Sequence, residues 1–228
     1  MSALPGGICD WLAGRGWSLH PHQARTLEAS GRAAVLLVAP TGTGKTLAGF
    51  LPTLAELGPA PAAGLHTIYV SPLKALTADI GRNLAAPIAG AGLAIRVEDR
   101  TGDTPQALRR RQRRDPPHIL LTTPESLALL LSLAEAPQIF AGLRRVIVDE
   151  IHALAESRRG AQLSLLIARL DRLAPGLRRV GLSATIADPE TMAGFLARDP
   201  ADCLVVRAEP GPPPVVSMLD TAPPPRSG

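Results

Sequence analysis

The amino-acid sequence predicts an α/β fold with a mostly parallel central sheet covered by helices on both faces. Three observations predict it. Short apolar, β-rich runs alternate with longer helical patterns, a hydrophobic content of 46% can fill a core, and 228 residues suit one domain of this kind. In addition, small and polar turns follow several of the apolar runs. In such a sheet, ligands bind at the carboxyl ends of the strands.

The strands are predicted from short runs rich in Val, Ile and Leu, and the helices from the longer stretches between them. Because most of these runs are apolar throughout, both faces of the sheet are expected to be covered. The predicted strands span residues 35–39, 66–71, 95–98, 119–122, 145–149, 180–183 and 204–207. The clearest helical patterns span residues 47–57, 73–85, 126–134 and 161–173.

Composition limits the class of protein. The formal net charge is +4, which permits nucleic-acid binding without proving it. Cys9 and Cys203 lie far apart in the sequence and do not suggest a disulfide framework, so a reducing, cytoplasmic location is expected. The sequence has neither the pattern of a signal peptide nor an apolar run as long as a membrane span, so no membrane partner is expected.

The most informative segment follows the run at 35–39, where an apolar strand reaches Pro40, passes two glycines and leads into a helical pattern. Glycines in such a loop let backbone N–H groups close on phosphates, and the helix N-terminus adds its positive dipole end. Lys45 is then expected to reach the β- and γ-phosphates of a nucleotide, and the Thr46 hydroxyl to bind Mg²⁺. Ala39 stands where the general pattern has its first glycine. The predicted nucleotide-binding residues are Thr41, Gly42, Thr43, Gly44, Lys45 and Thr46.

Two adjacent carboxylates end the buried run at 145–149. Successive side chains on a strand point to opposite faces, so Asp149 and Glu150 are expected to have different roles. Asp149 is expected to hold Mg²⁺, and Glu150 to polarise the water that attacks the γ-phosphate. The run at 180–183 leads to Ser183 and Thr185, whose hydroxyls are expected near the carboxylates if these strands lie side by side.

Taken in this order, the segments resemble the first, amino-terminal RecA-like domain of a superfamily 2 helicase. Within that superfamily the sequence is similar to the Lhr group and to its ligase-associated DNA DExH-box helicases. The resemblance implies a three-layer RecA-like P-loop NTPase fold, ATP and Mg²⁺ as cofactors, DNA as the substrate, a role in DNA repair and a link to a DNA ligase system. The segments that carry it are residues 17–23, 42–46, 71–76, 100–105, 120–130, 149–152 and 183–185.

The resemblance also implies roles for single residues. Gln23 is expected to read adenine through its amide, which can donate and accept hydrogen bonds together. The alternative for Gln23 is a helix residue behind Pro21 with no ligand. His152 is expected to act with the catalytic residues, linking the nucleotide site to Ser183, Thr185 and a partner domain, and its alternative is a histidine buried for packing.

Three loops are candidates for contact with the DNA backbone, because each follows a predicted strand and opens a helix or turn. Contacts of this kind carry no sequence information, as a translocating motor requires. Taken alone, each loop is also an ordinary helix start that needs no ligand. The candidate residues are Ser71, Pro72, Lys74, Thr101, Gly102, Thr123 and Pro124.

The basic run at 109–114 has two interpretations. It suggests a nucleic-acid patch, but it contains no aromatic residue for base stacking. A charge run this dense is as often a solvated helix face. No His and Cys residues have the spacing of zinc ligands, so a zinc site is not expected.

The chain is expected to divide into an N-terminal helical segment at 1–30, the RecA-like ATP-binding domain at 31–209 and a proline-rich linker at 210–228. A working helicase of this kind needs a second RecA-like domain, so the chain is interpreted as an excised or truncated motor half that is weak or inactive alone. Two alternatives stay open: a non-catalytic ATP- or nucleic-acid-binding module, and an RNA helicase of the same superfamily. A nucleotide kinase is disfavoured, because the segments at 149–152 and 183–185 have no ready role in one.

Overall fold

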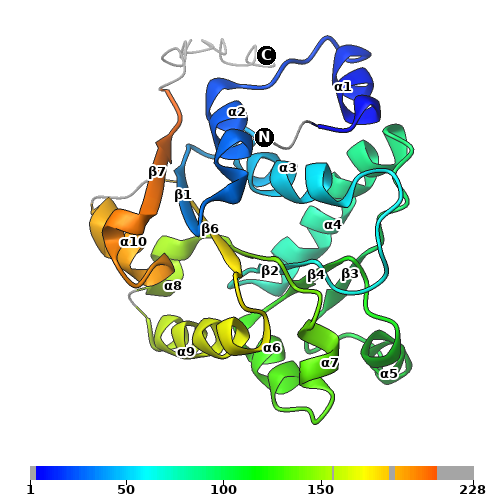
Figure 1. Cartoon of the computed structure of the whole chain (residues 1–228), viewed down its shortest axis with the longest axis vertical. Helices are drawn as coiled ribbons and strands as arrows, with labels where there is room; N and C mark the ends of the chain where they lie inside the picture. The colour runs from blue at the N-terminus through cyan, green and yellow to red at the C-terminus, as the bar shows by residue number, and fades with distance from the viewer. Residues whose placement is uncertain (1–3, 156, 185–187, 210–228) are drawn as a thin grey trace, which may run out of the picture.

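The computed structural model describes residues 4–155, 157–184 and 188–209. In these residues the chain forms one seven-stranded sheet with the strand order β3-β4-β2-β5-β6-β1-β7, and every neighbouring pair is parallel. Figure 1 shows helices on both sides of the sheet, as the sequence predicts. The strands are β1 (Ala34–Val38), β2 (Thr67–Val70), β3 (Val97–Arg100), β4 (Ile119–Thr122), β5 (Arg145–Val148), β6 (Arg178–Ser183) and β7 (Cys203–Arg207).

The helices form two layers, one on each face of the sheet. The first layer contains α1 (Gly6–Ala13), α2 (Pro21–Glu28), α3 (Lys45–Leu57) and α4 (Lys74–Gly90). The second contains α6 (Pro124–Leu131), α7 (Ala136–Phe140), α8 (Ile151–Ala155), α9 (Arg158–Leu173) and α10 (Pro189–Leu196). The helix α5 (Gln106–Arg114) contacts the edge strand β3, and two short 3₁₀ helices span Ala29–Gly31 and Pro200–Asp202. Within the part of the chain that the structure describes, no helix is both long and apolar enough to cross a bilayer.

The strand β1 shows why most strands of this sheet appear in the sequence as continuous apolar segments. Its side chains alternate between the two faces, and both faces are covered. Leu36 and Val38 pack into the layer of α6 to α10, whereas Val35 and Leu37 pack into the layer of α1, α3 and α4. All five residues of β1 are buried, so no position in this strand favours a polar side chain.

Several helices begin at sequence signals that act locally. Thr123 accepts a hydrogen bond from the Ser126 N–H and precedes Pro124, the first residue of α6. Asp188 caps α10 in the same way, ahead of Pro189. Such caps satisfy N–H groups that have no partner inside the helix, and proline at the first position loses nothing. They fix where the loops at the carboxyl edge of the sheet end.

Several predicted boundaries were wrong: the helix predicted at 73–85 extends to Gly90, and the one predicted at 161–173 begins at Arg158. Two further differences have local causes. The strand predicted at 95–98 lies at Val97–Arg100, because the backbone N–H of Arg96 donates to Nδ1 of His118, at 2.9 Å, instead of to a neighbouring strand. The helix predicted at 126–134 begins earlier, at Pro124, and ends at Leu131, where Ser132 forms its C-cap. Hydrogen bonds in turns and helix caps set both of these boundaries. The hydrophobic pattern alone does not reveal where such hydrogen bonds form.

A buried ion cluster joins the layers at the amino ends of β5 and β6. Glu56, near the end of α3, accepts hydrogen bonds from both Arg145 (2.9 and 3.1 Å) and Arg178 (2.6 and 2.9 Å). Both arginines also donate to the carbonyl of Ser30. Burial alone would raise the pKa of Glu56, but hydrogen bonds from His66 and Arg145 and the charges of both arginines lower it to about 2.

Candidate functional site

The loop between β1 and α3 has the geometry of an anion cradle. Gly42 and Gly44 have positive φ angles of 82° and 75°, which favour glycine. Gly44 is the N-cap of α3, and no side chain caps this helix. Its first N–H groups therefore remain available to a ligand. We call residues 41–46 the phosphate loop.

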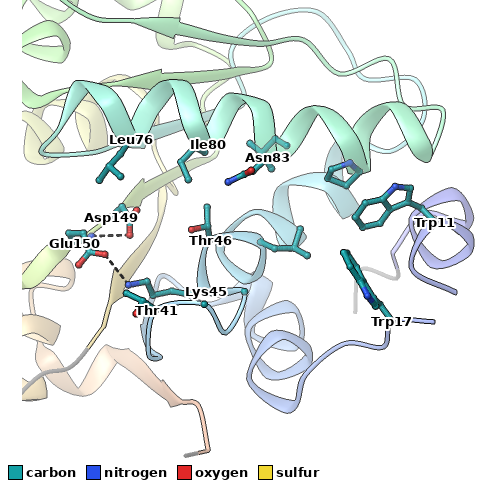
Figure 2. Close-up of a pocket in the computed structure, with 15 residues that line it drawn as sticks. Trp11, Trp17, Thr41, Lys45, Thr46, Leu76, Ile80, Asn83, Asp149 and Glu150 are labelled. Carbon is teal, nitrogen blue, oxygen red and sulfur yellow. Dashed lines mark hydrogen bonds and ion pairs between the residues drawn. The ribbon is translucent and has the colours of Figure 1, made fainter. Parts of the chain in front are cut away.

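A salt bridge connects the phosphate loop to the end of β5. Nζ of Lys45 lies 3.0 Å from Oε1 of Glu150, and only 6% of Lys45 is exposed. A buried ammonium needs an anionic partner. Figure 2 shows this pair at one end of a cavity, with Thr46 between it and the two tryptophans. The basic and acidic residues that the sequence predicts for one site are therefore in direct contact.

The two carboxylates at the end of β5, which we call the acidic pair, do diverge, but for a different reason than predicted. The strand β5 ends at Val148, and the Asp149 N–H still donates to the Val70 carbonyl at 2.9 Å, so the alternation of a strand does not extend to Glu150. Glu150 has a φ angle of 48°, and no other non-glycine residue of the described chain has a positive one. A left-handed backbone at a glutamate is uncommon and is found at functional sites. It turns Glu150 toward Lys45.

Asp149 is buried and has hydrogen-bond partners different from those of Glu150. Its carboxylate accepts hydrogen bonds from the Glu150 N–H, at 2.9 Å, and from the hydroxyl of Tyr69 on β2. Burial raises the pKa of Asp149, against the lowering effect of Tyr69 and of the Lys45 charge. A bound cation would favour its ionised form. The sequence interpretation missed Tyr69, the only tyrosine in the chain, although it lies on the strand predicted at 66–71.

His152 connects the acidic pair to β6. Nδ1 of His152 lies 2.8 Å from Oγ of Ser183, and its Nε2 lies 3.4 Å from Oε2 of Glu150. The strands β5 and β6 are parallel neighbours, which brings the two segments together as expected. Thr185, predicted to act with Ser183, lies outside the described residues.

Gln23 contacts the phosphate loop from α2. Its Oε1 accepts the His20 N–H at 2.9 Å, and its Nε2 donates to the Gly44 carbonyl at 3.3 Å. The neighbouring His22 is 3.0 Å from the Thr43 carbonyl. Gln23 therefore caps its own helix and also lies against the phosphate loop, whereas its reading of adenine stays a prediction. Pro21, at the first position of α2, places it there.

Two cavities open beside the phosphate loop. One, of about 420 Å³, is lined by the loop, the acidic pair, Trp11, Trp17 and α4 residues including Asn83. The other, of about 490 Å³, is lined by Trp17, His20, Gln23 and the loop glycines. Trp17 is 57% exposed and borders both cavities. The sequence interpretation assigned no role to Trp11 or Asn83, which lie far from the loop along the chain.

The oxygen donors in the first cavity suit a hard divalent cation. Thr46 and Asp149 line it together, offering a hydroxyl and a carboxylate. Mg²⁺ takes oxygen ligands, keeps several waters and needs only one or two protein ligands beside substrate phosphates. Among the described residues there is no group of three or more His, Cys, Asp or Glu side chains that could hold a metal. The residues therefore fit a cation held jointly with a ligand.

The three candidate nucleic-acid loops lie at the carboxyl ends of β2, β3 and β4, but most of their hydroxyls face inward. Ser71, Thr101 and Thr123 are at most 5% exposed. The Ser71 hydroxyl is within 3.3 Å of the Leu73 backbone, and Thr123 caps α6. Lys74 and Gly102 are exposed, and Lys74 pairs with Asp103 at 3.0 Å. In these loops, the charged side chain of Lys74 and the backbone at Gly102 face the solvent, whereas the hydroxyl side chains do not.

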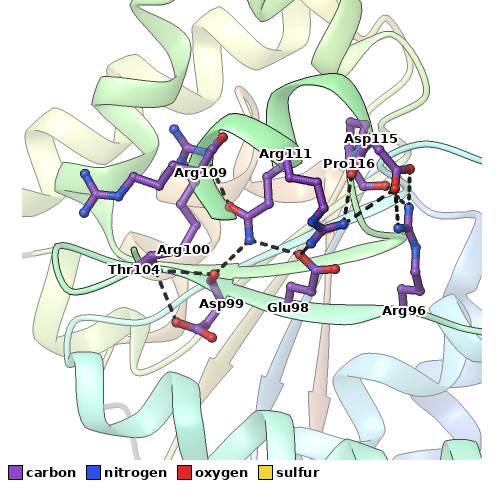
Figure 3. A network of polar contacts seen from close by, with 10 residues as sticks. Arg96, Glu98, Asp99, Arg100, Thr104, Arg109, Arg111, Asp115 and Pro116 are labelled. Carbon is purple, nitrogen blue, oxygen red and sulfur yellow. Dashed lines mark hydrogen bonds and ion pairs between the residues drawn. The ribbon is translucent and has the colours of Figure 1, made fainter. Parts of the chain in front are cut away.

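The basic run at 109–114 forms part of α5 and is largely tied to its own surroundings. Figure 3 shows Arg109, Arg111 and their neighbours around β3. Arg109 donates to the carbonyls of Thr101 (2.9 Å) and Gly102 (2.5 Å), and Arg111 pairs with Glu98. Arg110 and Arg114 are exposed. The structure thus gives two of these arginines a structural role.

Comparisons with known proteins agree with this geometry. The model of the DEAD/DEAH box helicase family matches residues 20–192. The chain is 47% identical over 176 residues to a protein of Mycolicibacterium smegmatis named "Lhr helicase/ probable uracil glycosylase", covering 71% of this chain and 12% of that protein. It is 43% identical over 190 residues to "ATP-dependent helicase Lhr-Core" of Methanothermobacter thermautotrophicus, covering 75% and 22%.

A comparison with solved structures agrees with the sequence comparisons. "Mycobacterium smegmatis helicase Lhr bound to ssDNA and AMP-PNP" superposes with a TM-score of 0.82 and 40% identity, over 90% of this chain and 28% of that one. The chain thus spans 12% and 22% of the length of these two curated relatives.

Proposed function

The chain belongs to the DEAD/DEAH box helicase family, and we propose that it is the ATP-binding and ATP-hydrolysing motor domain of a DNA helicase. One observation carries the proposal. The phosphate loop and the acidic pair line a single cavity, and Lys45 contacts Glu150 across it at 3.0 Å. A triphosphate placed there would meet free helix N–H groups, a buried ammonium and two carboxylates, which together serve phosphoryl transfer to water.

The roles divide by position. Lys45 and the phosphate-loop N–H groups hold the β- and γ-phosphates, and Glu150 orients the attacking water. Gln23, beside the loop, reads the adenine with its remaining amide N–H and oxygen lone pair. His152 lies within hydrogen-bond distance of Ser183 on β6. It links the acidic pair to β6 and, together with Thr185, to a second domain.

We propose Mg²⁺ as the cation that accompanies ATP. Thr46 and Asp149 would hold it, and it would supply charge neutralisation of the phosphates. Tyr69 keeps the Asp149 carboxylate oriented by donating its hydroxyl hydrogen bond. The protein's own contribution at this point is orientation and burial.

We propose DNA as the substrate, contacted by the loops at the carboxyl ends of β2, β3 and β4. The exposed Lys74 and Gly102 and the loop N–H groups would meet backbone phosphates. The solved Lhr helicase of Mycobacterium smegmatis is bound to single-stranded DNA, which supports this choice. A role in DNA repair, with a DNA ligase system as partner, and a cytoplasmic location complete the proposal, the last supported by free cysteines at Cys9 and Cys203.

We further propose that a second RecA-like domain completes the ATP site. The domain boundaries stay those predicted, at 1–30, 31–209 and 210–228, and the last segment lies outside the described residues. An arginine supplied across such an interface is worth about a thousandfold or more in hydrolysis rate. The chain by itself is therefore expected to bind ATP and to hydrolyse it slowly.

The test is ATP hydrolysis by this chain, alone and with a second RecA-like domain from a related helicase added as a separate polypeptide. Slow turnover that rises with the added domain and single-stranded DNA supports the proposal. Competition between DNA and RNA of one sequence then decides the nucleic acid. Failure to bind ATP·Mg²⁺ at millimolar concentration would overturn it, and binding without turnover in every mixture would indicate a non-catalytic module.

A further inference from the structure

Arg159, in the first turn of α9, bridges two segments that are distant in the sequence. Its Nε donates to Oε1 of Glu125 at 2.7 Å, and its NH2 group donates to Oε2 of Glu125 at 3.2 Å. The same NH2 group donates to the carbonyl of Pro72 at 2.9 Å. Only a planar guanidinium offers donors at two nitrogens in this fixed geometry, and a lysine has a single nitrogen.

The two partners of Arg159 belong to two of the candidate nucleic-acid loops. Pro72 follows β2, and Glu125 is the second residue of α6, directly after the loop that ends β4. The strands β2 and β4 are parallel neighbours. The guanidinium therefore ties together two adjacent loops at the carboxyl edge of the sheet and sets their separation.

On its other side, Arg159 lies at the start of a helix that contacts the helix following the acidic pair. That helix, α8, begins at Ile151, and Ser157 links it to α9: the Ser157 hydroxyl donates to the Leu154 carbonyl at 2.7 Å and accepts the Gly160 N–H at 3.2 Å. A Cβ atom added at Gly160 would lie 2.0 Å from the Leu154 carbonyl oxygen. The two helices are thus in direct contact through their backbones.

We infer that Arg159 is a positioning residue that couples the nucleotide site to nucleic-acid binding by holding the β2 and β4 loops in register with α8. The inference rests on the proposed function. Stability alone does not account for the bridge, because Arg159 and Glu125 are 40% and 53% exposed, and exposed pairs contribute little to folding. The bridge instead connects two proposed binding sites through one chain of contacts.

The experiment measures two affinities of this chain: for a fluorescent single-stranded oligodeoxynucleotide, with and without saturating AMP-PNP and Mg²⁺, and for AMP-PNP itself. In the Arg159→Ala variant we expect the effect of AMP-PNP on the oligonucleotide affinity to fall by about fivefold or more, a size typical of coupling between sites. AMP-PNP affinity without DNA and the unfolding midpoint should stay close to those of the wild type.

Arg158→Ala is the matched control, because it removes the same charge one residue away from an exposed position. Equal losses in both variants would overturn the inference in favour of simple charge attraction. Arg159→Lys should recover only part of the coupling. In a double-mutant cycle, Glu125→Ala should add little to Arg159→Ala, and additive losses would contradict the bridge.

The design separates this inference from the proposed function. If the wild-type chain binds neither AMP-PNP nor the oligonucleotide, the proposed function fails. If it binds both, and either shows no coupling or keeps the same coupling in Arg159→Ala, only the role of Arg159 fails.

Discussion

Nζ of Lys45 and Oε1 of Glu150 lie 3.0 Å apart, so the cation of the phosphate loop is paired with the carboxylate proposed to orient water. The pair gives a buried ammonium an anionic partner, and each group neutralises the charge of the other. A bound γ-phosphate would compete for Lys45 and release Glu150 toward the water.

Glu150→Gln should separate ATP binding from ATP hydrolysis. The amide keeps the shape of the side chain but cannot act as a base, so single-turnover hydrolysis should fall by at least about a hundredfold. Affinity for ATP·Mg²⁺ should stay within a few-fold of the wild type, as measured by fluorescence titration. Equal hydrolysis in both proteins would assign the water to another residue.

The two lysines of the chain should have separable roles. Lys45→Ala removes the ammonium at the phosphates and should weaken ATP binding by about tenfold or more, which corresponds to losing one charge-assisted contact. Lys74→Ala should leave ATP affinity unchanged and lower oligonucleotide affinity together with its salt dependence. Titrations of both ligands against both variants check this. A common loss of both affinities would indicate misfolding instead.

Gly44→Ala should impair the site through two effects. The φ angle of 75° is strained for alanine, and the added Cβ would lie 2.5 Å from Nε2 of Gln23. We expect a loss of about 1–3 kcal/mol in the free energy of unfolding and weaker ATP binding. Gly42→Ala is the control, because its φ angle is 82° but no atom lies within 4 Å of the added Cβ. If the two variants behave alike, the contact with Gln23 has no effect.

The ion cluster around Glu56 should make the free energy of unfolding depend on pH in the acid range. The folded-state pKa of about 2 lies below the ordinary 4.5, so the ionised carboxylate stabilises the fold fully above pH 4.5. This contribution, about 3 kcal/mol, is lost as the pH falls from about 4.5 to about 2. Urea unfolding of the wild type should show that loss. Glu56→Gln should be less stable at pH 7 and flatter in this window.

Glu135→Gln is the control for this pH dependence. The Glu135 side chain is 50% exposed, and its ion pair with Arg113 spans 3.9 Å. Its removal should leave the acid profile unchanged. A wild-type profile that is flat between pH 4.5 and pH 2 would contradict the role of the buried cluster.

The sheet can be predicted well from the sequence because each strand is marked by the residue types within its own short segment. Most of the seven runs are apolar enough to be buried on both faces, with the edge strand β3 as the clearest exception. Glycines and proline mark the phosphate loop. The contacts that complete the site are not local. Tyr69 reaches Asp149 from a neighbouring strand, and Arg145, predicted only as the start of a strand, is buried against Glu56 on a helix.

The backbone at Glu150 shows the same limit. A left-handed φ angle at a glutamate has no sequence signal, because glycine or asparagine would normally mark such a turn. It follows from the surroundings, in which Lys45 attracts the side chain and Asp149 accepts the Glu150 N–H. The divergence of the acidic pair could be predicted, whereas its cause could not.

We expect the phosphate loop and the acidic pair to form one ATP·Mg²⁺ site. The most direct test is a crystal structure of the chain with a non-hydrolysable ATP analogue and Mg²⁺. We expect the triphosphate on the N–H groups of the loop, Mg²⁺ held by Thr46 and Asp149, and Lys45 moved from Glu150 to the phosphates. An empty cavity, or a nucleotide bound with Asp149 and Glu150 facing away from it, would contradict the claim.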